Sequence, residues 1–392
     1  MTKGFRAAAC ALLGAAWVLA AGWPAAAGAG SVPTAKPESV GLSIERLQRV
    51  HAAMQAQIEA GNIAGVVTLV ARRGRIAHLE AQGFADLAKR TPMRTDNIFG
   101  LASMSKPITG VAVMMLVESG DIRLSDPVSK FIPEFAAPAM VAVPKPNGAE
   151  GYDLVSATRP ITVADLLKHG SGLLSGGLGN RVADQTAPRT PTDTLATYIP
   201  KLGKVPLDFQ PGTLWRYSGL AGFDVLSRIV EVVSGQTYDK YLDERLFKPL
   251  GMKDTAFAFS DARAQRVASL HSRRDGKLEV TPRTLDSVFF SGAGGLASTA
   301  DDYLQFAQML LNGGELNGRR FLSPRTIELM TSNHTGDMVN GQFGRPAHGM
   351  GFGLSMQVVQ DPVAAELAVS KGAYGWAAAR ASASGSSRPS RW

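Results

Sequence analysis

The order of the secondary-structure patterns along the chain constrains the fold more than any other feature of the sequence. Apolar residues recur at helical spacing over Ser43–Gly61, and the β-rich run Ala64–Ala71 and the turn Arg73-Gly74 predict a hairpin. The proline-rich stretch Pro133–Pro160 predicts a loop, several short helix patterns follow, and a strand-like run returns at Phe352–Val359. Because strands and helices do not alternate, we expect an α/β protein of the α+β type. Both ends of the chain would complete one antiparallel sheet around a mostly helical insertion.

The N-terminal segment has the pattern of an export signal. Residues 1–29 contain two basic residues, then the apolar stretch Ala7–Ala21, then small residues suited to cleavage. We therefore expect a periplasmic or secreted protein of bacterial origin, with no stable membrane insertion after cleavage. The single cysteine, Cys10, lies inside this signal. The mature chain would have no disulfide and no catalytic thiol.

The net charge of +8 does not indicate a nucleic-acid partner. Without residues 1–30 and the last sixteen residues, 36 basic and 33 acidic residues remain. No stripe of Lys and Arg is interleaved with aromatic residues, as a phosphate backbone would require. The six histidines have no metal-binding spacing, and no phosphate or dinucleotide motif is present. We expect no cofactor and no metal; the oligomeric state is not indicated.

A Ser-x-x-Lys motif, Ser103-Met-Ser-Lys106, begins the apolar helix pattern that ends at Glu118. Residues three apart share one helix face, so the Ser103 hydroxyl and the Lys106 amine can meet. Free N–H groups in the first helical turn can face an oxyanion. Lys106 can act as a base only if burial and the helix end lower its pKa from ~10.4 toward neutrality. In isolation, the motif also fits a capped helix with a solvated lysine.

The surrounding segment, Ile98–Glu118, closely resembles the nucleophile helix of the penicillin-recognising serine hydrolases. This family includes class C β-lactamases, D-alanyl-D-alanine carboxypeptidases and family VIII carboxylesterases. Further similar segments are Asp126-Pro127, Ile161–Leu173, Pro249–Met252, Ser291–Leu296 and Gly351–Leu354. The resemblance covers residues 37–376. It implies the β-lactamase/transpeptidase-like fold, in which helices flank an antiparallel sheet and one subdomain is mostly helical.

The resemblance also implies the other site residues. The family's Tyr-x-Asn element corresponds to Tyr217-Ser-Gly219, where Tyr217 would relay protons between Ser103, Lys106 and the leaving group. Gly219 replaces the amide that would bind the acylamino arm of a penicillin or peptide, which favours simple esters. After the Ser-x-x-Lys and Tyr-x-Asn elements, the family has a third catalytic element, which carries an oxyanion donor. Trp376 leads into this element. Ser103, Gly219 and Trp376 are thus the expected substrate and oxyanion contacts.

After Trp376 the sequence departs from the family. Residues 377–392 contain no aliphatic side chain larger than alanine and have the composition of a GC-rich gene read out of frame. We expect a frameshift or truncation here, with an aberrant disordered tail and with the final strands and helix missing. The sheet would then keep an unpaired edge. Losing one oxyanion donor typically costs ~10²–10³ in rate, so the activity of this chain would be impaired.

Together these features predict an exported serine hydrolase that cleaves a small-molecule ester or amide, carboxylic esters first. Ser103 would form an acyl-enzyme, with Lys106 and Tyr217 transferring protons. His169 occupies a position that is structural in the resembling family and receives no catalytic role. Two alternatives remain: a β-lactamase or D-alanyl-D-alanine carboxypeptidase, and a catalytically impaired binding or sensor protein.

Overall fold

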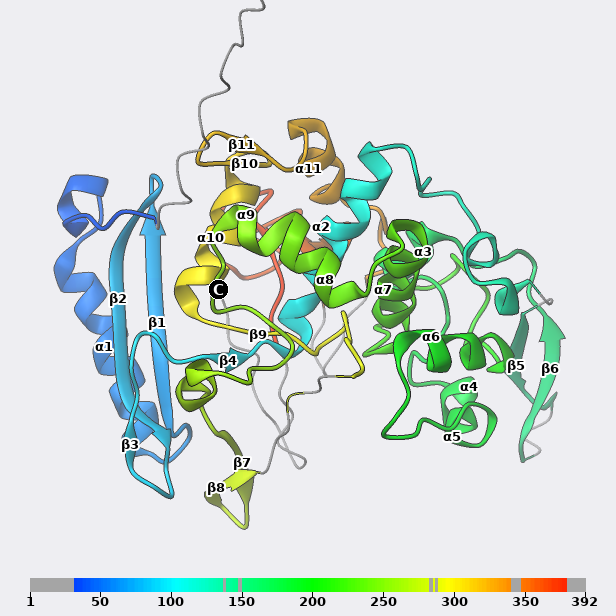
Figure 1. Ribbon diagram of the computed structural model, residues 1–392, viewed down its shortest axis with the longest axis horizontal. Helices are drawn as coiled ribbons and strands as arrows, with labels where there is room; N and C mark the ends of the chain where they lie inside the picture. Colours follow the sequence, from blue (N-terminus) through cyan, green and yellow to red (C-terminus); the bar gives the residue numbers. More distant parts are fainter. Residues whose placement is uncertain are drawn as a thin grey trace, which may run out of the picture.

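A helix packed on a β-hairpin forms the N-terminal part of the computed structural model (Figure 1). The structure describes residues 32–136, 139–146, 150–281, 285, 288–339 and 347–378. The predicted export signal at 1–29 and residues 379–392 of the predicted tail lie outside this part. None of the helices in the described ranges has the length and apolarity needed to cross a membrane.

The predicted first helix and hairpin are confirmed. Helix α1 (Ile44–Glu59) begins after Ser43, whose side chain accepts a hydrogen bond from the backbone N–H of Arg46. Strands β1 (Gly65–Arg72) and β2 (Arg75–Asp86) pair antiparallel, and β3 (Thr91–Pro92) pairs with the other edge of β2. Helix α1 covers one face of this sheet, and α10 (Ala300–Leu311) lies on its other side (Figure 1).

The helix that carries the Ser-x-x-Lys motif runs through the centre of the molecule (Figure 1). Helix α2 (Ser105–Glu118) is preceded by the 3-10 turn η2 (Ala102–Met104), so Ser103 lies in this turn and Lys106 in the first turn of α2. Eleven of the fourteen residues of α2 are buried. A helix that is apolar all round is typical of a protein core. It packs against α7 (Ala221–Ser234), the helix that follows Tyr217.

The remaining helices are short. Side-chain caps begin several helices of the fold: Thr162 forms a capping box with Asp165, and the side chains of Thr299 and Ser323 accept from backbone N–H groups of the first helical turn. The other helical elements are η1 (Pro37–Val40), η3 (Val128–Lys130), η4 (Pro133–Phe135), α3 (Val163–Leu167), α4 (Leu178–Arg181), α5 (Ala183–Thr186), α6 (Leu195–Tyr198), η6 (Ile199–Lys204), α8 (Tyr238–Leu242), η7 (Asp243–Phe247), α9 (Lys248–Leu250), η8 (Ala262–Arg266) and α11 (Pro324–Met330). Helices α3 to α7 are grouped on one side of α2 (Figure 1).

Two short strands bring distant parts of the chain together beside the motif. Strand β4 (Phe99–Gly100) pairs with β9 (Ala297–Ser298), so the segment before Ser103 lies next to residues almost 200 positions later. Two small hairpins lie later in the chain: β7 (Leu270–Arg274) with β8 (Lys277–Thr281), and β10 (Glu315–Leu316) with β11 (Arg319–Arg320).

The strands differ from the prediction in two places. The stretch expected to be a loop contains a hairpin, β5 (Met140–Pro144) and β6 (Tyr152–Ser156). The late strands β12 (Met350–Phe352), β13 (Gln357–Val359) and β14 (Tyr374–Gly375) pair with one another. Within the described ranges they do not join β1 and β2, so the expectation of one sheet completed by both chain ends is not met there. The fold class, antiparallel sheets flanked by helices, is confirmed.

Candidate active site

The turn that carries Ser103 is held from several sides. The backbone N–H of Leu101 donates to the carbonyl of Leu296 at 2.8 Å, and the Tyr303 hydroxyl donates to the carbonyl of Met104 at 3.1 Å. Ala102, directly before Ser103, has a φ of 44°, in the left-handed region that non-glycine residues rarely occupy. Such a conformation costs about 1–3 kcal/mol and is typical of functional sites.

Lys106 is fully buried, and its amine has three oxygen neighbours. The Nζ atom lies 2.7 Å from the carbonyl oxygens of both Gly219 and Ala293, and 3.3 Å from Ser103 Oγ. A neutral amine has two N–H donors and one lone pair. The two carbonyls can accept the two hydrogens, which leaves the lone pair for the hydroxyl proton of Ser103. The same three oxygens can also accept from the three N–H groups of the protonated amine, so the surroundings of Lys106 suit both of its protonation states.

The electrostatics of Lys106 agree with this geometry. Burial lowers the pKa of Lys106 to about 7, and the Asp224 carboxylate opposes the shift. Near neutral pH a large fraction of the amine is therefore unprotonated, as a general base requires.

Tyr217 completes the group around Ser103. Its hydroxyl donates to Ser103 Oγ at 2.7 Å, and the Lys106 amine lies 5.0 Å from the centre of its ring. Burial raises the pKa of Tyr217, and the contacts with Ser103 and Trp376 oppose the shift. Tyr217 is thus a proton donor at neutral pH. With Lys106 neutral, the serine hydroxyl can accept from Tyr217 while donating to Lys106.

The His169 ring packs against the Tyr217 ring, with 4.6 Å between the two ring centres. Its Nδ1 accepts a hydrogen bond of 3.2 Å from the backbone N–H of Ser218, which fixes the loop that carries Tyr217. Burial, and secondly the charge of Lys106, lowers the pKa of His169 well below its ordinary value. A buried neutral histidine that anchors a backbone has a structural role.

Gly219 and Trp376 also lie at this site, so all five predicted residues come together. The carbonyl of Gly219 holds Lys106, while a Cβ added at Gly219 would meet no atom within 4 Å. The Trp376 ring, just after β14, has its centre 5.5 Å from that of Tyr217 and 5.3 Å from that of Phe352. The roles predicted for Gly219 and Trp376 in binding substrate or oxyanion stay predictions.

The sequence interpretation missed two parts of the site. One is the carbonyl of Ala293, which holds Lys106 from a turn 187 residues away. The other is Asp224, a buried carboxylate on α7. A signal for Asp224 was present: it is an acidic residue within the apolar segment Phe223–Leu226.

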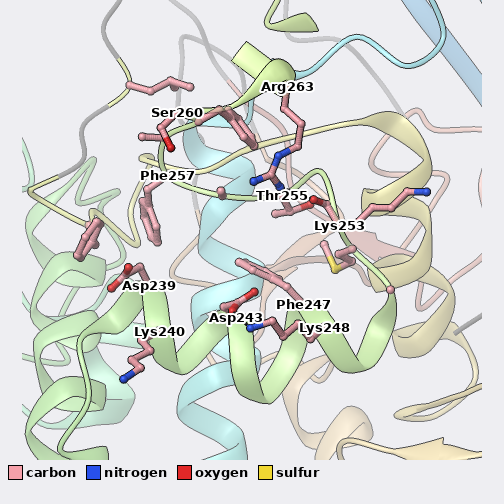
Figure 2. Close-up of a pocket in the computed structure, with 17 residues that line it drawn as sticks. Asp239, Lys240, Asp243, Phe247, Lys248, Lys253, Thr255, Phe257, Ser260 and Arg263 are labelled. Atoms are coloured by element: carbon pink, nitrogen blue, oxygen red, sulfur yellow. Dashed lines mark hydrogen bonds and ion pairs between the residues drawn. The ribbon is translucent and has the colours of Figure 1, made fainter. Parts of the chain in front are cut away.

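A cavity of about 1030 Å³ lies away from this site. It opens between η7, α9 and the segment that follows them, with Phe247, Lys253 and Phe257 among its lining residues (Figure 2). Ser103, Lys106 and Tyr217 do not line it. Across the described ranges, no three His, Cys, Asp or Glu side chains are grouped as metal ligands.

Known proteins similar to this chain include esterases. The model of the Beta-lactamase family matches residues 50–387. Protein Rv1367c of Mycobacterium tuberculosis is 36% identical over 326 residues, 79% of each chain. Esterase EstB of Burkholderia gladioli is 31% identical over 355 residues, 84% of each chain. The solved structure of EstCE1, a hydrolase with promiscuous acyltransferase activity, superimposes with a TM-score of 0.69 at 27% identity, covering 83% of this chain and 86% of that one.

Proposed function

Because the chain belongs to the Beta-lactamase family and is a serine hydrolase, we propose that it cleaves carboxylic esters through an acyl-enzyme on Ser103. The observation that carries the proposal is the contact between the buried Lys106 amine and the Ser103 hydroxyl, 3.3 Å apart. The similarity to esterase EstB supports an ester as the substrate. The N-terminal signal pattern supports a site of action outside the cytoplasm.

In the first half of the reaction, Ser103 takes over the acyl group. Lys106 accepts the hydroxyl proton as Ser103 Oγ attacks the ester carbonyl. The bond between the carbonyl carbon and the alkoxy oxygen then breaks, and the proton passes from Lys106 through Tyr217 to the departing alcohol. Tyr217 suits this transfer because its hydroxyl already lies 2.7 Å from Ser103 Oγ.

In the second half, water releases the acid. A water molecule attacks the acyl carbonyl and gives its proton to the Lys106–Tyr217 pair, and the same proton returns to Ser103 Oγ as the ester bond to the enzyme breaks. The negative charge on the carbonyl oxygen needs preorganised donors in both halves. We propose the backbone N–H of Ser103 as one donor; the second donor would be expected after Trp376, where this chain departs from the family sequence.

The preference for esters follows from what the site lacks. Gly219 has no side chain to bind an acylamino group, although the space beside it is open. At the same site, Tyr217 and Trp376 form an aromatic cluster with Trp215 and Phe352. Such a surface favours apolar acyl or alcohol groups over the amide arms of penicillins and peptides.

We expect a p-nitrophenyl butyrate kcat/KM at least about tenfold above that for nitrocefin or a D-Ala-D-Ala peptide. One missing hydrogen bond to an amide arm costs about 1–2 kcal/mol, which corresponds to this factor. The measurement is steady-state hydrolysis of the three substrates by wild type and Gly219→Asn. The added amide has room and is expected to raise nitrocefin hydrolysis relative to ester hydrolysis.

Two outcomes contradict the proposal. Faster cleavage of nitrocefin or the peptide than of the ester would identify a β-lactamase or a carboxypeptidase. A folded protein that cleaves none of the three and whose Ser103 does not react with a fluorophosphonate would be a binding protein.

A further inference from the structure

Asp224 is a buried carboxylate for which the proposed reaction has no step. The residue is 3% exposed and lies on α7, in the first turn after Tyr217 and Gly219. Its Oδ1 accepts hydrogen bonds from Ser291 Oγ at 2.6 Å and from the backbone N–H of Ala293 at 3.2 Å. Burying a carboxylate is costly unless it is hydrogen-bonded or paired. An apolar residue at this position would avoid that cost.

Ala293 connects Asp224 to Lys106. Its N–H donates to the carboxylate, while its carbonyl accepts from the Lys106 amine at 2.7 Å. Asp224 thus binds the N–H of Ala293, while the carbonyl of the same residue fixes the direction of the Lys106 amine.

The turn that contains Ala293 has little freedom to move. A Cβ at Gly292 would lie 2.0 Å from Ser227 Oγ and 2.6 Å from Thr109 Oγ1, so α7 and α2 both press against this turn. The Thr109 hydroxyl also donates to the carbonyl of Gly292 at 2.8 Å. Because the turn is clamped between two helices, the position of Asp224 is transmitted to the carbonyl that holds Lys106.

We propose that Asp224 is a positioning residue for Lys106: through Ala293 it orients the amine, and its negative charge favours the protonated amine. The inference deepens the proposed function, since it rests on Lys106 as the base. Asp224 need not touch the substrate. Its charge would keep the base close to balance between its two protonation states near neutral pH, where general bases work best.

Several charged or titratable groups face Lys106 and Asp224. Tyr217 and His169 face Lys106, and both are neutral at pH 7. Asp224 is faced by Lys106 and Arg189, and by the neutral hydroxyls of Tyr198 and Tyr238. Burial raises the pKa of Asp224 to about 6, so most of it is still ionised at pH 7. Its charge therefore acts on Lys106 in the pH range where the base works.

The test measures the rate at which a fluorophosphonate labels Ser103, from pH 5 to pH 9, in wild type and Asp224→Asn. Asparagine keeps an oxygen that can accept from Ser291 and Ala293 but removes the charge. We expect the midpoint of the rate curve to move down by about one pH unit, because a nearby opposite charge typically shifts a pKa by one unit or more. A purely structural role would lower the rate without moving this midpoint.

Two further variants complete the design. Asp224→Leu removes both the charge and the acceptor, and we expect its highest labelling rate to fall about tenfold or more. Asp193→Asn is the matched control, because Asp193 is also a buried carboxylate, but it pairs with Lys201, whose amine lies 3.0 Å away. Its midpoint is expected to equal that of wild type. Circular dichroism shows which variants fold. If Asp224→Leu does not fold, the midpoint measured for Asp224→Asn alone tests the positioning role.

The readings separate this inference from the proposed function. An Asp224→Asn midpoint equal to that of wild type would overturn the positioning role, whatever the substrate is. Labelling without ester hydrolysis would contradict the ester proposal alone. A wild type that is folded but not labelled would contradict both, because Lys106 would then not activate Ser103.

Discussion

Replacing Lys106 with alanine is expected to lower kcat/KM for p-nitrophenyl butyrate by about 10³–10⁴-fold. General base catalysis contributes up to about this factor, and the Lys106 amine is the group that contacts Ser103 Oγ from within the core. Tyr217, the other contact of Ser103, has a raised pKa and therefore cannot replace it as a base at neutral pH. The measurement is steady-state hydrolysis at pH 7.5, with folding checked by circular dichroism.

Lys106→Arg is the control that separates charge from basicity. Arginine keeps a positive charge at the position but stays protonated at any accessible pH. We expect this variant to lose almost as much activity as the alanine variant. If it retained more than a tenth of the wild-type rate, the amine would act through its charge alone and not as a base.

Replacing Tyr217 with phenylalanine is expected to lower the same kcat/KM by about 10²–10³-fold. The substitution removes the hydroxyl that donates to Ser103 Oγ at 2.7 Å, and with it the proposed route of the proton to the departing alcohol. The aromatic ring remains, so its packing on His169 should persist. The loss should be smaller than for Lys106, because water can deliver a proton to an activated leaving group.

The matched control is Tyr241→Phe, which removes the hydroxyl of another buried tyrosine, on α8. Its kcat/KM is expected to stay within about threefold of wild type. If Tyr217→Phe had an equally small effect, Tyr217 would not take part in proton transfer.

The sequence could predict those parts of the site that depend on local spacing. Ser103 and Lys106 are three residues apart at the start of a helix, so helical geometry alone brings them together. Thr162 and Asp165 form their capping box for the same reason, since both groups lie within one turn. Tyr217, Gly219 and Trp376 could be named only through the family resemblance, because they lie more than 110 residues from Ser103.

Contacts made by the backbone could not be predicted. The two carbonyls that hold Lys106 belong to Gly219 and Ala293, and any residue type can supply a carbonyl at these positions. The partnership of Asp224 with Ser291 depends on how α7 packs, which no local pattern specifies. The hairpin β5–β6 was missed because its strand Tyr152–Ser156 is mostly exposed and shows no alternation of buried and exposed residues.

The most direct test of the central claim is the pH dependence of fluorophosphonate labelling in the wild-type protein, with the modified peptide identified by mass spectrometry. Since a neutral Lys106 takes the Ser103 proton in the proposed reaction, the labelling rate should rise with pH and reach half its maximum near pH 7, where burial places the pKa of Lys106. The adduct should lie on Ser103 and be absent from Ser103→Ala. An adduct on another residue, or a midpoint above pH 9 as for a solvated lysine, would contradict the account.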